Sequence, residues 1–65
     1  MNTSEHKIGD LLLGFDYRKR PQLGYISEIV EGQYVIDWIE IGHAVSNEVD
    51  IEMFKDNLRR HIGTT

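Results

Sequence analysis

Cysteine is absent from the 65-residue chain, and proline occurs only once. Without cysteine there are no disulfide bridges and no thiolate metal ligands, which commonly supplement the core of a small domain. Long apolar runs are also missing. None approaches the roughly 20 residues of a membrane helix, and the N-terminus lacks the apolar stretch of a secretory signal. We therefore expect a soluble, cytoplasmic protein that does not contact the membrane.

Positive charge is in the minority. The chain has seven lysine and arginine residues against eleven acidic residues, so its formal net charge is −4 at pH 7. Such a chain repels phosphate backbones as a whole, although a local basic patch remains an option. A chain of this length buries only about 60% of its unfolded surface. Self-association is therefore the stabilising supplement that we expect.

Recognisable catalytic motifs are missing as well. No serine stands in a Gly-x-Ser-x-Gly elbow, and the six glycines are too scattered to form a phosphate-binding loop. No two of the three histidines, His6, His43 and His61, are close enough in sequence to suggest paired metal ligands on one element. We therefore predict a non-enzymatic protein with no cofactor and no metal.

Short apolar runs predict strands in the first two thirds of the chain. Lys7–Phe15 is bounded by glycines and is expected to be the first strand, followed by a long exposed loop over 16–22. Gly24–Val30 and Tyr34–Ile41 are rich in β-branched and aromatic residues and flank a short turn that contains glycine. This arrangement is typical of a β-hairpin.

The last third of the chain allows two interpretations. After an expected loop over 42–47, acidic and apolar residues alternate over Glu48–Met53, which favours a strand. In the preferred interpretation, a short helical turn through Leu58 and a last strand over 59–62 follow. The alternative is an amphipathic helix with Asp50 as its N-cap, because the apolar residues are also spaced three or four apart. These apolar residues are Ile51, Phe54, Leu58 and Ile62.

The order of these signals resembles that of SH3-like barrels, especially the small stand-alone ones encoded by tailed bacteriophages. The resemblance rests on Gly9-Asp10-Leu11, Gly24-Tyr25-Ile26, Tyr34-Val35-Ile36-Asp37-Trp38 and Asp56-Asn57-Leu58. It implies an all-β fold with five strands in two orthogonally packed sheets and a 3₁₀ turn before the last strand. The barrel would span residues 7–62, between flexible ends at 1–6 and 63–65.

Related barrels bind proline-rich peptides, modified lysines, RNA or other proteins, so the resemblance implies a binding module without naming its ligand. In peptide-binding SH3 domains, aromatic and acidic residues surround the first loop. Here only Phe15, Asp16 and Tyr17 match that pattern, and the loop itself is basic. Binding of proline-rich peptides is therefore not expected.

Alternation along the predicted strands identifies a core and a contact surface. The predicted core comprises Leu11, Leu13, Ile26, Ile36, Val49, Ile51 and Leu58. Trp38 shares one face of its strand with Tyr34 and Ile36, while apolar residues also occupy the other face. A strand that is apolar on both faces favours contact with a partner. The predicted partner-binding residues are Tyr17, Tyr25, Val35, Ile39 and Ile41.

The leading hypothesis is a homodimeric phage protein that engages a host or virion protein through apolar and acidic surface. Glu48, Asp50 and Glu52 are expected to form one outward face of the predicted strand over 48–53, where they would guard an edge against aggregation. The alternative hypothesis is weak binding of single-stranded nucleic acid, because cations beside an aromatic ring suit phosphates and stacked bases. The residues predicted for this alternative are Tyr17, Arg18, Lys19, Arg20, Arg59 and Arg60.

Overall fold

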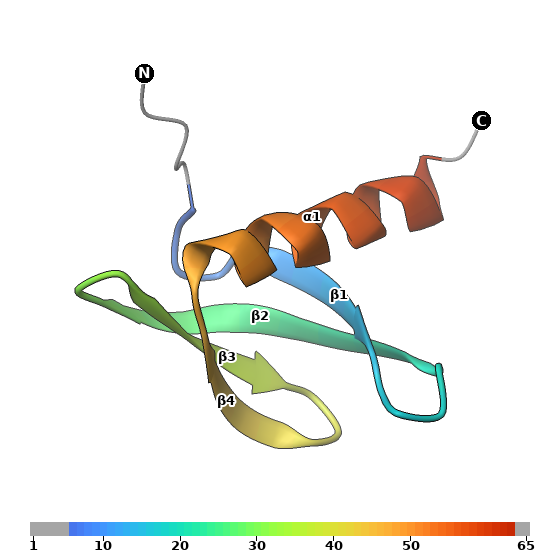
Figure 1. Ribbon diagram of the computed structural model, residues 1–65, viewed down its shortest axis with the longest axis horizontal. Coiled ribbons are helices and arrows are strands. Elements are labelled where there is room, and N and C mark those ends of the chain that lie inside the picture. Colours follow the sequence, from blue (N-terminus) through green and yellow to red (C-terminus); the bar gives the residue numbers. More distant parts are fainter. Residues whose placement is uncertain (1–5, 64–65) are drawn as a thin grey trace.

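The computed structural model describes residues 6–63, in which four antiparallel strands form an open sheet and one helix covers one of its faces (Figure 1). The elements are β1 (Leu11–Phe15), β2 (Pro21–Val30), β3 (Gln33–Trp38), β4 (Gly42–Ser46) and α1 (Glu48–Ile62). The strands lie in the order β1-β2-β3-β4, so each pairs with its neighbour in sequence. β1 and β4 form the two edges and do not pair with each other, so the sheet stays open.

The five-stranded SH3-like barrel that the resemblance implies is wrong, and so is the all-β fold class. The main cause is the segment 48–62, which forms one continuous helix in place of a strand, a 3₁₀ turn and a last strand. Asn47 caps this helix, because its side-chain oxygen accepts a hydrogen bond from the Asp50 backbone N–H at 2.9 Å. Asp50 lies in the first turn of the helix and is not its N-cap.

Charge also favours the helical form of this segment. Glu48 and Asp50 lie in the first turn of α1, where the helix dipole is positive. Arg59, Arg60 and His61 lie in the last turn, where the dipole is negative. Both ends of the helix therefore carry the charges that stabilise it.

The hairpin predicted around residues 31–33 is confirmed as β2 and β3. Glu31 and Gly32 both have positive φ angles, of 44° and 84°, as a two-residue turn between twisted strands requires. A register shift between Ile26 and Glu28 sets Ser27 and Glu28 together opposite Val35. The predicted loop over 42–47 is instead mostly β4, which pairs with β3 from Tyr34↔Ser46 to Trp38↔Gly42.

The core lies between α1 and the sheet. Its buried members are Leu12, Ile26, Tyr34, Ile36, Trp38 and Ile51, with Ala44 and Phe54 packed against them. The rings of Trp38 and Phe54 meet edge to face, with centroids 5.1 Å apart. Gly14 and Gly24 leave room for Trp38, since a Cβ atom on either would lie within 3 Å of its ring.

The predicted core is correct at Ile26, Ile36 and Ile51, which belong to this cluster. Leu13 is buried as predicted but does not belong to the cluster. The prediction is wrong at Leu11 and Val49, whose exposed fractions are 53% and 74%. The helix turns Val49 toward solvent. Leu58 is partly buried on α1.

The tails predicted at 1–6 and 63–65 lie outside the described residues except for His6 and Gly63. Within the described range 6–63, no helix has the length and apolar character needed to cross a membrane.

Candidate functional site

The face of the sheet opposite α1, here called the outer face, is the candidate binding surface. Leu12 and Gly24 face the core, so alternation turns their neighbours Leu11 and Tyr25 to the opposite side. The same alternation assigns ten residues to the outer face. These are Leu11, Leu13, Leu23, Tyr25, Ser27, Glu28, Val35, Asp37, His43 and Val45.

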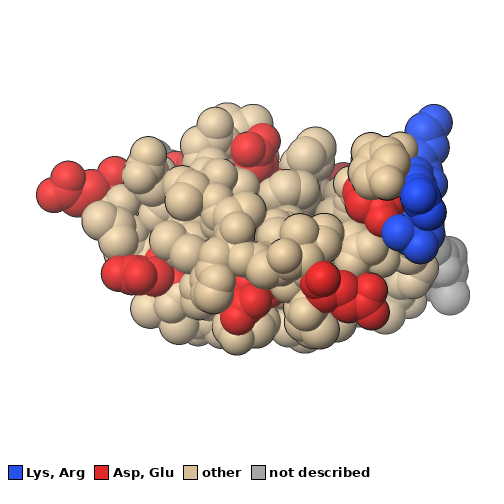
Figure 2. Space-filling model, turned by 90° about the horizontal axis from the view of Figure 1, so that it is seen from below, with Lys and Arg blue, Asp and Glu red and all other residues tan. Residues whose placement is uncertain are grey.

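Apolar side chains make up much of this face. Leu11, Leu23 and Val45 are exposed, whereas Val35 and Tyr25 are half-buried. The surface in Figure 2 shows a broad uncharged area with scattered acidic side chains, and basic side chains gather at one end of the molecule. An antiparallel sheet that faces water usually turns polar residues outward, so this composition is unusual for a solvated face.

A small polar group lies among these apolar residues. The Tyr25 hydroxyl donates a hydrogen bond to Asp37 Oδ2 at 2.9 Å, and His43 Nε2 lies 3.9 Å from the same oxygen. Hydrogen bonding to the Asp37 carboxylate raises the pKa of the Tyr25 hydroxyl above its usual 10.0. The centre of the face therefore holds an aspartate carboxylate beside a histidine ring.

The structure only partly brings the predicted partner-binding residues together. Tyr25 and Val35 lie on the outer face, and the Ile39 backbone N–H bonds the Leu23 carbonyl at the margin of this face. Ile41 lies away from them, in the lining of a cavity of about 280 Å³ that also includes Trp38. Tyr17 lies in the loop between β1 and β2.

Sequence reasoning missed Leu23 and Val45. The sequence predicts a loop over 42–47, because Gly42, Ser46 and Asn47 are typical turn residues, and Val45 falls within it. The alternation of His43, Ala44 and Val45 was the available signal of a strand.

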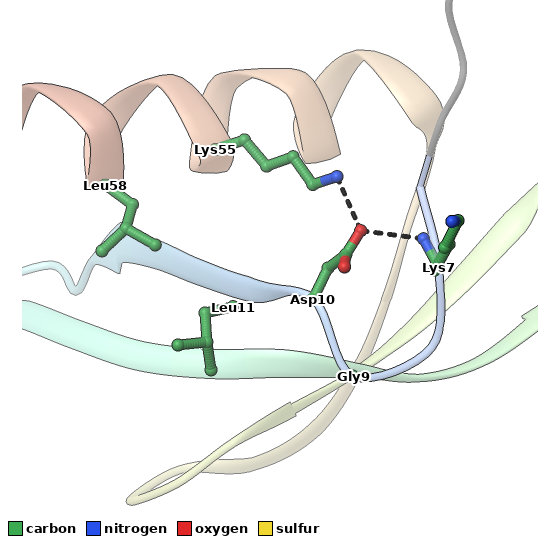
Figure 3. A pocket seen from close by; sticks show the side chains of 6 residues that line it. All are labelled: Lys7, Gly9, Asp10, Leu11, Lys55 and Leu58. Atoms are coloured by element: carbon green, nitrogen blue, oxygen red, sulfur yellow. Dashed lines mark hydrogen bonds and ion pairs between the residues drawn. The ribbon is translucent and has the colours of Figure 1, made fainter.

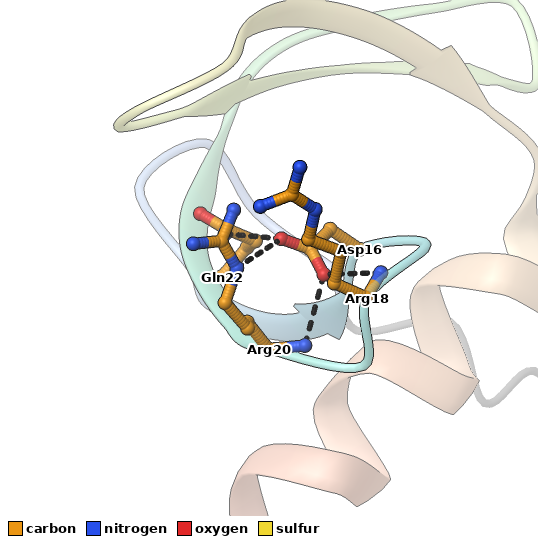
Figure 4. A network of polar contacts seen from close by, with 4 residues as sticks. All are labelled: Asp16, Arg18, Arg20 and Gln22. Carbon is orange, nitrogen blue, oxygen red and sulfur yellow. Dashed lines mark hydrogen bonds and ion pairs between the residues drawn. The ribbon is translucent and has the colours of Figure 1, made fainter.

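Asp16 organises the loop between β1 and β2 (Figure 4). Its Oδ1 accepts hydrogen bonds from the backbone N–H groups of Arg18 and Arg20, at 2.8 and 2.9 Å. Its Oδ2 accepts from the side chains of Arg20 and Gln22, at 3.2 and 3.0 Å. These donors, led by the Arg20 backbone N–H, hold the pKa of Asp16 below its usual 3.8. The loop therefore has a defined shape that one carboxylate maintains.

Two groups of basic residues lie at the same end of the molecule. The Arg18 guanidinium lies 5.4 Å from the centroid of the exposed Tyr17 ring. On α1, Arg59 and Arg60 both form ion pairs with Asp56, at 3.1 and 3.0 Å. Arg60 lines a cavity with Phe15, the last residue before the loop. The final turn of α1, and not a paired last strand, brings the second basic group to this end.

A third polar cluster anchors the segment before β1 to the helix (Figure 3). Asp10 Oδ2 accepts hydrogen bonds from the Lys7 backbone N–H at 2.8 Å and from Lys55 Nζ at 2.7 Å. The hydrogen bond from Lys55 is the main cause of the lowered pKa of Asp10. Leu11 and Leu58 line the open cavity beside this cluster. Its contacts give it a structural role in joining two distant parts of the chain.

No protein-family model matches the chain, and comparisons with curated proteins and with solved structures give no match either.

Proposed function

We propose that this protein is a non-enzymatic binding module that self-associates through its outer face as a two-fold symmetric dimer in the cytoplasm. The observation that carries the proposal is the apolar outer face of the open sheet. Burial of apolar surface is worth roughly 25 cal/mol per Å², and a chain this small has few other sources of stability. Two outer faces packed together would supply a second core.

Charge favours a second copy of the chain as the occupant. The basic loop with Arg18 and Lys19 lies at the start of β2, whereas Glu28 and Glu31 lie at its far end. A two-fold axis in the plane of the interface and across β2 would set each basic end against the acidic end of the partner. An axis along β2 would set like charges together. Both axes would pack the two sheets face to face with their strands aligned, and charge favours the axis that runs across β2.

The polar residues at the centre of the outer face suit the same arrangement. Asp37 and His43 are paired neighbours on β3 and β4, a carboxylate beside an imidazole. A two-fold contact repeats every interaction, so Asp37 of each copy could meet His43 of the other. The face is therefore self-complementary in its polar groups as well as in its apolar surface.

Sedimentation equilibrium of the parent and two variants tests this proposal. Val45→Glu puts a charge on the outer face, and Val49→Glu puts the same charge on the exposed side of α1 as a matched control. Val45→Glu should be monomeric and should keep its helical circular dichroism, whereas the control should remain a dimer. A monomeric parent at millimolar concentration would overturn the proposal, and so would a dimer that survives Val45→Glu.

A second candidate function is binding of single-stranded nucleic acid at the basic end. The observation that favours it is Tyr17, which is 86% exposed and lies beside the Arg18 guanidinium. Such a ring offers a base a stacking surface beside a cation. Binding of labelled single strands that disappears when Arg18, Lys19 and Arg20 are all alanine would support this function over the dimer.

A further inference from the structure

We propose that His6, Glu48 and Glu52 form a binding site for a divalent transition-metal ion such as Zn²⁺. One ring nitrogen of His6 and one carboxylate oxygen of each glutamate lie within 4.8 Å of one another. The three residues lie apart from the outer face and from the basic end. The site is therefore independent of the proposed dimer.

Local structure brings the three side chains together. Glu48 and Glu52 are four residues apart on α1, so they lie on the same side of the helix. His6 reaches them from the segment before β1, where its ring packs edge to face against Tyr34 with centroids 5.5 Å apart. The turn that follows His6 is tied to α1 by the ion pair between Asp10 and Lys55. Two distant parts of the chain thus converge on one point.

The environment of His6 is the second, independent observation. Both of its ring nitrogens are shielded from solvent, and neither has a hydrogen-bond partner within residues 6–63. Buried polar atoms almost always have a partner, and an exception commonly marks a missing water or ion. The helix dipole accounts for glutamates in the first turn of α1, but it does not account for this imidazole. A metal ion held by the two glutamates would give one of the His6 ring nitrogens a partner.

The chemistry of the donors indicates which metals fit. An imidazole nitrogen with two carboxylate oxygens suits Zn²⁺ and its first-row neighbours, whereas Ca²⁺ and Mg²⁺ prefer all-oxygen sites. Two carboxylates balance the charge of a dication. Tetrahedral zinc with bonds of about 2.0–2.2 Å would hold its ligand atoms roughly 3.4 Å apart, which requires a small inward rotation of the side chains. The exposed side chain of Glu52 is free to make that adjustment. Three protein ligands would leave a fourth position for water.

Isothermal titration of the full chain with ZnCl₂, after treatment with a chelator, tests this inference. We expect one zinc per chain and a rise of several degrees in the melting temperature at saturation, since a ligand that binds only the folded state stabilises it. Co²⁺ should give visible absorption bands on binding. CaCl₂ should neither bind comparably nor raise the melting temperature.

Variants locate the site. His6→Phe keeps a ring against Tyr34 but removes both nitrogens, and Glu52→Gln removes one ligand charge at an exposed position. Each should weaken zinc binding at least tenfold, whereas the matched exposed controls His61→Gln and Glu28→Gln should bind like the parent. Without metal, His6→Phe should melt no lower than the parent. Three results would overturn the inference: no saturable zinc binding by the parent, unchanged binding in His6→Phe, or binding lost in the His61 control.

Discussion

Asp10 shows how a single side chain joins distant parts of this molecule. Its carboxylate binds the backbone N–H of Lys7 and the ammonium of Lys55, which lies 45 residues further along the chain. The side chains of Asp10 and Lys55 are 31% and 24% exposed, so solvent screens the pair only in part. The interaction fixes the turn before β1 against α1.

This pair predicts a pH dependence of stability. The pKa of Asp10 is lowered in the folded protein, mainly by the hydrogen bond from Lys55, while the unfolded chain keeps a value near 3.8. The stabilisation is therefore complete above about pH 4 to 5 and is lost as the pH falls through the folded-state pKa. Asp10→Asn should lower the melting temperature at pH 7. The difference in melting temperature between this variant and the parent should become smaller in acid. A difference that stays constant down to pH 2 would contradict this account.

Ile36 and Val49 provide a matched pair of truncations. Ile36 is fully buried beneath α1, whereas Val49 projects from α1 into solvent. Ile36→Ala should cost about 2–5 kcal/mol of unfolding free energy, because it leaves a cavity in a core of few side chains. Val49→Ala should change stability by less than about 0.5 kcal/mol or raise it slightly, since alanine is the better helix former. Urea denaturation of both variants measures the difference, and equal costs would mean that residues 48–53 are not helical.

At the scale of the element, α1 shows why local patterns are ambiguous. Val49, Ile51 and Met53 alternate with acidic residues, as in a strand, yet Ile51, Phe54 and Leu58 also follow helical spacing. The hairpin was predictable because its residues and its turn agree on one structure. The packing of Ile51 and Phe54 against the sheet favours the helix over the strand. This contact is between distant parts of the chain, so the local sequence pattern does not reveal it.

The residues of the outer face, like the elements of the fold, could be predicted from the sequence only in part. Val35 and Tyr25 were identified because they lie in the hairpin, whose register was clear. Val45 and Leu23 were not, because they join the outer face only through the pairing of β4 and β1 with the hairpin. The cluster at His6 depends on a contact between the segment before β1 and the first turns of α1, which spacing in sequence does not reveal.

The helix cap gives a prediction for the element as a whole. Asn47 Oδ1 accepts the Asp50 backbone N–H, one of the donors that a helix leaves without an internal partner. Asn47→Ala should therefore destabilise the protein by about 1 kcal/mol, whereas Asn47→Asp keeps the acceptor and should melt close to the parent. Thermal unfolding followed by circular dichroism at 222 nm compares the two. Equal melting temperatures for Asn47→Ala and the parent would place the helix start elsewhere.

At the scale of the whole molecule, charge is divided unequally. Five of the seven lysine and arginine residues lie in the loop between β1 and β2 or in the last turn of α1, although the net charge is −4. These five are Arg18, Lys19, Arg20, Arg59 and Arg60. The molecule therefore has one basic end, opposite the turn between β2 and β3 (Figures 1 and 2).

This division limits how strongly the protein can bind single-stranded nucleic acid. Up to five cations on phosphates give a slope of log affinity against log salt of at most about −3.5, and stacking on Tyr17 adds roughly 1–3 kcal/mol. Arg59 and Arg60 already share Asp56, which weakens their contribution. We expect weak binding or none in fluorescence anisotropy titrations at 50 and 150 mM salt. Tight binding with a slope steeper than −4 would show that other residues take part.

The strand order also bears on how the chain reaches this fold. Each strand pairs with its neighbour in sequence, and such pairings close only short loops, which favours rapid folding. The docking of α1 against β1 is different, since Asn57 bonds the Leu13 carbonyl across 44 residues. Because closing that longer loop costs more entropy, we expect helix docking to follow strand pairing. A four-stranded sheet without docked α1 would leave the side chains of Leu12 and Ile26 facing water, so we expect such a species to be prone to aggregate.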